Sequence, residues 1–142
     1  MKNKPISNYH THTYLCKHAN GKPVDYVKRA IELNYQEIAI TDHGPLIDDI
    51  IKNFYTRRMS FDQYYKNYLP DLEFAIKKYS SKINILKGLE IEYFENMTNE
   101  YEAFLQKLEN KLKVIPVAGD TLAMVPTLVS LIRNYVKKEY TE

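Results

Sequence analysis

Short apolar segments that suit buried strands alternate with segments of helical periodicity, and this alternation limits the folds open to the chain. Residues 24–34 (VDYVKRAIELN) carry apolar side chains at helical spacing, with Pro23 in the first turn and Asn34 at the end. Residues 36–44 (QEIAITDHG) then form a nearly continuous apolar run closed by Gly44 and Pro45. This order predicts the α/β class, with a parallel sheet and helices outside it.

The rest of the chain continues the alternation. We expect a first strand that ends near His12, a loop with a short helical piece at 46–59, a helix at 60–79, a strand at 83–93, a helix at 98–112, a possible strand at 114–118 and a helix up to Tyr140. Pro70 is expected to kink the helix at 60–79 or to split it. Pro116 argues against an interior strand at 114–118, because proline cannot donate to a ladder.

Composition bounds the class of protein and its compartment. The 142 residues suffice for one domain with a core, and shares of 44% hydrophobic and 27% charged residues are those of ordinary soluble globular proteins. The net charge of +2 without a dominant basic run gives no sign of a nucleic-acid partner. One cysteine, no signal peptide and no membrane-length apolar run predict a cytoplasmic protein without a membrane partner.

Three of the four histidines and the only cysteine fall within residues 8–21 (NYHTHTYLCKHANG). His10 and His12, at i and i+2, project from the same side of an extended strand and can converge on one ion. His18 follows in a turn-forming segment and can fold back as a third ligand. The alternative for each is a surface or core histidine. For Cys16, a small buried hydrophobic side chain is the favoured interpretation over a thiolate ligand.

Further polar side chains end the next two predicted strands: Asp42 and His43 the second, Glu90 and Glu92 the third. Ligands of parallel sheets gather beyond the carboxyl ends of the strands. Each residue has an ordinary structural explanation, such as a turn, a buried imidazole or a solvated carboxylate, yet their coincidence on one rim favours a shared site. Imidazole and carboxylate ligands suit Zn, Mn or Fe better than Mg or Ca.

These motifs resemble a known family. The segments HTHTYLCKHANG, AITDHGP and LKGLEIEY look like the first three motifs of the PHP (polymerase and histidinol phosphatase) superfamily of metallohydrolases, and the intervening segments are similar to its histidinol-phosphate phosphatase branch. The resemblance covers roughly residues 4 to 112. It implies part of a distorted (β/α)7 barrel, here about four parallel strands, with up to three Zn, Mn or Fe ions at the strand ends. It also implies hydrolysis of a small phosphate monoester, L-histidinol phosphate, in histidine biosynthesis.

The resemblance also implies roles for individual residues. Five positions match the family's metal ligands: His10, His12, His18, His43 and Glu90. Asp42 and His43 are the expected catalytic residues, and Asp42 has the alternative role of closing a turn. Glu92 matches no ligand position and is a candidate for an outer supporting group. Arg58, with Arg57 beside it, follows the second strand, where its guanidinium can reach a substrate phosphate. A solvated pair in a loop is the alternative for these arginines.

The chain also departs from the family pattern. The family's barrel is roughly twice as long and supplies further histidines and a late Asp-x-His pair, whereas no histidine follows His43 here. We therefore expect residues 1–112 to be the N-terminal half of a PHP domain and 113–142 a divergent tail. Asp120 falls near the family's next histidine, although capping of the following helix is the favoured role. A truncated, inactive metal-binding remnant is the alternative function.

A sheet of about four strands would leave two open edges, which predicts a homo-oligomer. Nuclease-like proofreading is another activity in the superfamily. It is disfavoured because the sequence shows no cluster of basic residues typical of a groove that binds nucleic acid.

Overall fold

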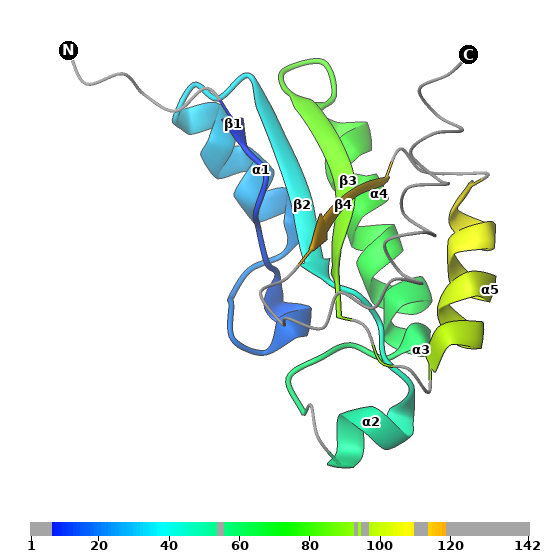
Figure 1. Ribbon diagram of the computed structural model, residues 1–142. Coiled ribbons are helices and arrows are strands. Elements are labelled where there is room, and N and C mark those ends of the chain that lie inside the picture. Colours follow the sequence, from blue (N-terminus) through cyan, green and yellow to red (C-terminus); the bar gives the residue numbers. More distant parts are fainter. Residues whose placement is uncertain (1–6, 54–55, 93, 95–96, 110–113, 119–142) are drawn as a thin grey trace.

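The computed structural model describes residues 7–53, 56–92, 94, 97–109 and 114–118. Their centre is a parallel four-stranded sheet in the order β1-β2-β3-β4 (Figure 1). The strands are β1 (Ser7–Asn8), β2 (Glu37–His43), β3 (Asn84–Ile91) and β4 (Val114–Ala118). The predicted α/β class with about four parallel strands is therefore confirmed.

The first strand is shorter than the sequence suggested. The backbone N–H of His10 donates to the side-chain oxygen of Asn8 at 3.0 Å, and the N–H of Thr11 donates to Oγ1 of Thr41 at 2.9 Å. These two backbone N–H groups donate to side chains instead of to the carbonyls of a neighbouring strand. Such bonds interrupt the hydrogen-bond ladder of a sheet and end the strand. His10 and His12 lie beyond β1, so the prediction that they share a regular strand face is wrong.

The helices lie where the apolar periodicity placed them. They are α1 (Pro23–Glu32), α2 (Asp48–Asn53), α3 (Phe61–Gln63), α4 (Leu69–Tyr79) and α5 (Thr98–Glu109), with a short 3-10 helix η1 (Tyr14–Cys16). Figure 1 shows α1 and α4 side by side against the sheet. The connections at the carboxyl ends of β1 and β2 carry η1 and α2, so these loops border the rim where the polar residues were predicted.

The long helix predicted at 60–79 is interrupted before Pro70. Helix α3 starts with a capping box in which Oγ of Ser60 accepts from N of Gln63 at 3.2 Å and Oε1 of Gln63 accepts from N of Ser60 at 3.0 Å. A π-helical segment η2 (Tyr64–Tyr68) follows, and α4 begins at Leu69. Proline has no N–H and its ring crowds the carbonyl four residues back, so a wider turn here has a steric reason.

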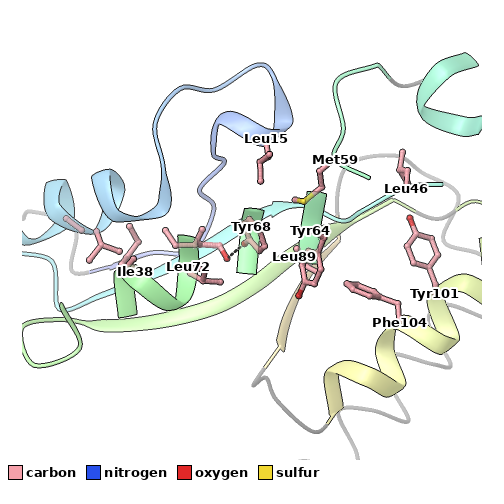
Figure 2. Close-up of a cluster of buried hydrophobic side chains, with 14 of the residues drawn as sticks. Leu15, Ile38, Leu46, Met59, Tyr64, Tyr68, Leu72, Leu89, Tyr101 and Phe104 are labelled. Atoms are coloured by element: carbon pink, nitrogen blue, oxygen red, sulfur yellow. Dashed lines mark hydrogen bonds between the residues drawn. The ribbon is translucent and has the colours of Figure 1, made fainter. Parts of the chain in front are cut away.

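The core lies between the sheet and the helices, and Figure 2 shows its central side chains. Tyr64, Tyr68 and Leu72 of the interrupted helix are buried with Leu89 of β3. The hydroxyl of Tyr68 lies 3.2 Å from the carbonyl of Ile40 and 3.3 Å from that of Gly88, so its single proton is shared between β2 and β3. Burial raises the pKa of Tyr68 well above its ordinary value, which keeps the phenol a donor.

Strand β4 occurs as predicted, although Pro116 lies inside it, opposite Leu89 of β3. Within the described residues β4 pairs only with β3, so it is an edge strand, and edge strands tolerate a missing donor. The missing N–H of Pro116 would disrupt an interior strand, which pairs on both sides, but not this edge strand. The predicted helix up to Tyr140 and Asp120 lie outside the described residues. Among those that are described, no helix is long and apolar enough to cross a membrane.

Candidate metal centre

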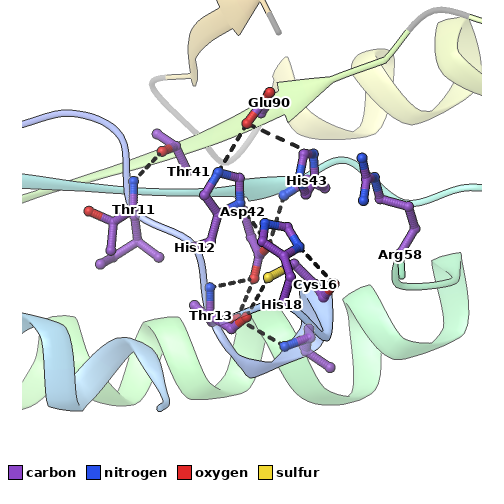
Figure 3. A network of polar contacts seen from close by, with 12 residues as sticks. Thr11, His12, Thr13, Cys16, His18, Thr41, Asp42, His43, Arg58 and Glu90 are labelled. Carbon is purple, nitrogen blue, oxygen red and sulfur yellow. Dashed lines mark hydrogen bonds and ion pairs between the residues drawn. The ribbon is translucent and has the colours of Figure 1, made fainter. Parts of the chain in front are cut away.

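All four histidines of the chain meet at the carboxyl ends of β2 and β3, and Figure 3 shows three of them, His12, His18 and His43. His43 ends β2 and is the register partner of Glu90 in β3, so the sheet itself sets these two side by side. The ring centroid of His12 lies 4.9 Å from that of His10, 5.1 Å from that of His18 and 4.5 Å from that of His43. The five predicted ligand residues are thus brought together.

The tightest part of the cluster is a triangle of three atoms. The Nε2 atoms of His10 and His12 lie 2.8 Å apart, and each is 3.1 Å from Oε2 of Glu90. The side chain of His10 is 58% exposed, whereas those of His12 and Glu90 are 16% and 11% exposed. One corner of the triangle therefore faces solvent, and the other two are largely enclosed.

Hydrogen bonds alone cannot satisfy this triangle. A neutral imidazole nitrogen either carries one proton or offers one lone pair, and an ionised carboxylate only accepts. Protons on both Nε2 atoms would oppose each other along the 2.8 Å edge. A single proton can bridge that edge, but the unprotonated nitrogen then turns its lone pair towards Oε2 of Glu90. Ligand atoms bound at about 2.0–2.1 Å to a single ion lie about 3 Å from one another. The three separations fit ligand atoms that could share a cation.

A second group consists of His12, Cys16 and His18, with one possible ligand atom of each within 4.8 Å of the others. Helix η1 positions the last two: Oγ1 of Thr13 caps the helix by accepting from N of Leu15. Nδ1 of His18 lies 3.0 Å from the carbonyl of Cys16, which leaves its Nε2 available. Burial raises the pKa of the Cys16 thiol, and its sulfur donates to the carbonyl of Thr13 at 2.9 Å. These contacts favour a buried thiol at Cys16.

His43 is the most enclosed imidazole, only 7% exposed, and its Nδ1 has no hydrogen-bond partner within the described residues. Its Nδ1 lies 3.8 Å from Oε2 of Glu90 and 3.9 Å from Oε1 of Glu92. Burial and, to a smaller extent, the positive charge of Arg58 lower the pKa of His43 to about 4. The negative charges of Glu90 and Glu92 raise this pKa but do not offset the lowering. At neutral pH the ring is therefore uncharged and has a lone pair to offer.

Arg58 lies beside this imidazole and is held by Glu92. Its Nε donates to Oε2 of Glu92 at 2.7 Å, its Nη2 donates to Oε1, and its Nη1 donates to the carbonyl of Arg57 at 2.8 Å. The side chains of Arg58 and Glu92 are 14% and 10% exposed, so this two-bond pair is not a solvated loop pair. Glu92, for which the sequence suggested only an outer role, thus places a guanidinium at the rim of the cluster.

The carboxylate of Asp42 is fully buried and lies among backbone and hydroxyl donors. Its Oδ2 accepts from N of Thr13 at 3.0 Å and from Oγ1 of Thr13, and its Oδ1 accepts from N of His43 at 2.9 Å. The role of Thr13 was missed from the sequence. The alternation of threonine with histidine in HTHT was its only signal in the sequence.

Contacts outside the cluster hold the histidine loop in place. The hydroxyl of Tyr14 and Nζ of Lys22 donate to the Asp71 carboxylate of α4 at 3.1 and 3.0 Å. Nζ of Lys17 donates to the carbonyl of Thr56 at 2.9 Å, which joins this loop to the one that carries Arg58. The histidine loop is therefore hydrogen-bonded both to α4 and to the loop that carries Arg58.

The donor set fits a divalent transition metal. Imidazole nitrogens and one carboxylate oxygen predominate, and the buried Nδ1 of His43 has no hydrogen-bond partner within the described residues. Such ligands suit Zn, Mn or Fe. His10, His12 and Glu90 are placed to hold one ion, and His18 and His43 complete the cluster around it.

Comparison with known proteins finds relatives that are named histidinol-phosphatases. The chain is 29% identical over 94 residues to a "Probable histidinol-phosphatase" of Schizosaccharomyces pombe, covering 63% of this chain and 30% of that protein. It is 24% identical over 102 residues to the histidinol-phosphatase of Bacillus subtilis, covering 68% and 37%. The chain thus spans about a third of the length of these curated relatives.

Comparison with solved structures also finds a protein named as a histidinol phosphatase. The crystal structure of hisK from Listeria monocytogenes, provisionally named a histidinol phosphatase, matches with a TM-score of 0.62 and 28% identity, over 73% of this chain and 41% of that one. The match supports a partial PHP-type barrel. The family model of the PHP domain matches residues 8–125, which include all five predicted ligand residues and reach into the segment 113–142. The chain belongs to the PHP domain family.

Proposed function

We propose that the chain forms part of a metal-dependent phosphate-monoester hydrolase whose substrate is L-histidinol phosphate. The observation that carries the proposal is the convergence of His10, His12 and Glu90, whose nearest ring nitrogens and carboxylate oxygen lie 2.8 to 3.1 Å apart. The substrate is suggested by the histidinol-phosphatase names of the relatives. A place in histidine biosynthesis belongs to the same proposal.

The metal ligands are His10, His12, His18, His43 and Glu90, and the candidate ions are Zn, Mn and Fe, up to three in the complete family site. When bound, such ions supply positive charge for phosphate oxygens and lower the pKa of a water molecule towards about 7. The residues around them enclose the site: His43 and Glu90 are 7% and 8% exposed. No serine or cysteine nucleophile is required by this chemistry, in agreement with the buried thiol of Cys16.

Arg58 is the proposed substrate-binding residue. Its guanidinium already has a planar two-bond partner in Glu92, and a phosphate presents the same geometry of paired oxygens. A phosphate at the rim would add a further partner for this charge. His43 and Asp42 are the proposed catalytic residues, because uncharged Nδ1 of His43 can bind an ion or accept a proton, while Asp42 fixes the backbone of His43.

Binding of metal without turnover is the second candidate function. It is favoured because the described ligand cluster draws on residues 10–90 alone, while the matched relatives are about twice as long as this chain. Phosphoryl transfer needs the attacking and leaving oxygens held in line, and a loosely held second ion would cost orders of magnitude in rate. The two candidates share the ligand set and differ only in activity.

Phosphate release from L-histidinol phosphate distinguishes them. The 142-residue chain is assayed with Zn, Mn or Fe and after treatment with a chelator. We expect weak activity that requires added metal, well below the ordinary turnover of about 10 per second. Metal binding without any phosphate release would favour the second candidate. The absence of both would contradict the proposed site.

The matched variants are Glu90→Gln and Glu37→Gln. Glu90 belongs to the triangle, whereas Glu37 starts β2 at the opposite end of the sheet, where it bonds Tyr9 and Asn84. Both substitutions remove one carboxylate charge and keep the shape. Glu90→Gln is expected to abolish metal-dependent activity, and Glu37→Gln to retain it. Equal losses would show that the effect comes from stability and not from the site.

A further inference from the structure

The Asp42 carboxylate has one acceptor position left. An ionised carboxylate offers about four lone-pair positions. Three are filled by N of Thr13, Oγ1 of Thr13 and N of His43. The remaining one is on Oδ1, which lies 3.6 Å from Nδ1 of His12 (Figure 3). Nδ1 of His12 is itself buried and has no hydrogen-bond partner within the described residues. A free acceptor and a free ring nitrogen thus face each other.

The two tautomers of His12 differ sharply in this setting. With its proton on Nε2, the ring could donate to Oε2 of Glu90 at 3.1 Å, but it would occupy the nitrogen of the triangle and turn the Nδ1 lone pair towards the fully buried Asp42 carboxylate, which is repulsive. With its proton on Nδ1, the ring donates towards Oδ1 and leaves the Nε2 lone pair towards His10 and Glu90. Only the second tautomer presents a ligand atom to the triangle.

We infer that Asp42 is a positioning residue that sets the tautomer of His12 and thereby aims its Nε2 lone pair at the metal. The inference rests on the proposed metal-dependent function and adds a role that acts through His12 without contact with substrate. Carboxylates that accept from a metal-bound histidine have this effect, and their removal typically weakens metal binding about 10- to 100-fold.

Asp42 reaches the other side of the cluster as well. Its partner Thr13 caps η1 through the 3.4 Å contact from N of Leu15 to Oγ1. Helix η1 ends at Cys16, two residues before His18, so the same carboxylate fixes the start of the segment that presents His18. A single buried group thus orients one ligand directly and a second through the helix cap.

The tautomer can be measured in the unaltered, metal-free chain. Long-range proton–nitrogen NMR of histidine side chains distinguishes a protonated Nδ1 from a protonated Nε2, and variants of the other three histidines assign the His12 signal. We expect His12 to carry its proton on Nδ1 at neutral pH. A proton on Nε2 would overturn the inference, and this readout needs neither metal nor activity.

The substitution Asp42→Asn provides the second test. An amide can keep the acceptor for Thr13 while its NH2 group faces Nδ1 of His12, which favours the wrong tautomer, as in the histidine of a catalytic triad whose aspartate is replaced by asparagine. We expect the His12 proton to move to Nε2 and zinc affinity, measured with zinc alone, to fall about 10- to 100-fold. The same NH2 group would face the backbone N–H of His43, which now donates to Oδ1 of Asp42, and two facing donors could destabilise the fold. The free energy of unfolding is therefore measured in parallel.

Asp71→Asn is the matched control. Asp71 holds the same loop through Tyr14 and Lys22 but touches none of the histidines in the described structure. We expect it to leave the His12 tautomer unchanged and to alter zinc affinity far less. Equal weakening by Asp42→Asn and Asp71→Asn would show that Asp42 only stabilises the loop. If the unaltered chain bound no zinc, the proposed function would fail, while the tautomer measurement would still decide this inference.

Discussion

The metal ligands differ in how firmly the chain holds them. His12 belongs to both possible ligand groups and its side chain is 16% exposed, whereas His10 belongs to one group and is 58% exposed. Water can replace an exposed ligand more easily than an enclosed one. His12 is therefore the residue on which occupancy of the site depends most.

This difference gives a prediction about metal content. We expect the purified chain to carry substoichiometric Zn, Mn or Fe, His10→Ala to lower the metal content in part, and His12→Ala to abolish it. Elemental analysis after dialysis measures all three, together with the double variant. Equal metal in the unaltered chain and in the double variant would rule out this site.

A second prediction at this scale concerns Tyr68, whose hydroxyl donates to carbonyls of the two central strands. Tyr68→Phe should lower the free energy of unfolding by about 1 kcal/mol, because it removes a buried hydrogen bond without changing the packing. Tyr65→Phe, at a side chain that is 42% exposed on the same helix, should change it by less than about 0.5 kcal/mol. Urea unfolding compares them, and similar losses would contradict the assigned role.

Among the elements, the helices and the inner strands follow from the sequence. Hydrophobic periodicity predicted α1, β2, β3 and α5 because it reports directly which face is buried. The end of β1 did not follow, since it depends on side chains of Asn8 and Thr41 that replace ladder partners. The position of Pro116 on an edge depends on strand order, which no local pattern contains.

In the candidate metal site, too, some features follow from the sequence and others do not. The five ligand residues could be predicted because parallel strands end at one rim and because the motifs resemble a family. The contacts of Asp42 with Thr13 and of Arg58 with Glu92 could not, because they join positions 29 and 34 residues apart. Such pairs form only when the loops have folded over the sheet.

The start of the interrupted helix supplies a prediction at the scale of elements. Ser60 caps α3 and its reciprocal bonds with Gln63 precede the π-helical segment and Pro70. Ser60→Ala should lower the free energy of unfolding by about 1 kcal/mol, because an N–H at the helix start loses its partner. Ser80→Ala, at the other end of α4 where Ser80 N donates to Ile76 O and no side-chain capping bond is described, is the control. Chemical denaturation measures both, and equal effects would argue against the capping box.

At the scale of the whole molecule, the sheet is open within the described residues. Its order is β1-β2-β3-β4, and the outer strands β1 and β4 each pair on one side only. Unpaired strand edges attract other strands, because their N–H and C=O groups lack partners. A parallel sheet is also ordinarily covered on both faces. These features make association of chains the expected way to complete the barrel-like sheet.

We therefore expect a dimer or larger assembly, measured by light scattering over a range of micromolar concentrations. Association through strand edges uses backbone hydrogen bonds and apolar contacts, which salt screens little, and the net charge of +2 adds little repulsion. The mass should accordingly be the same at low and high ionic strength. A mass that falls with added salt would indicate contacts between charged side chains instead. A monomer at every concentration would show that a single chain covers its own sheet edges, and association would then play no part in completing the sheet.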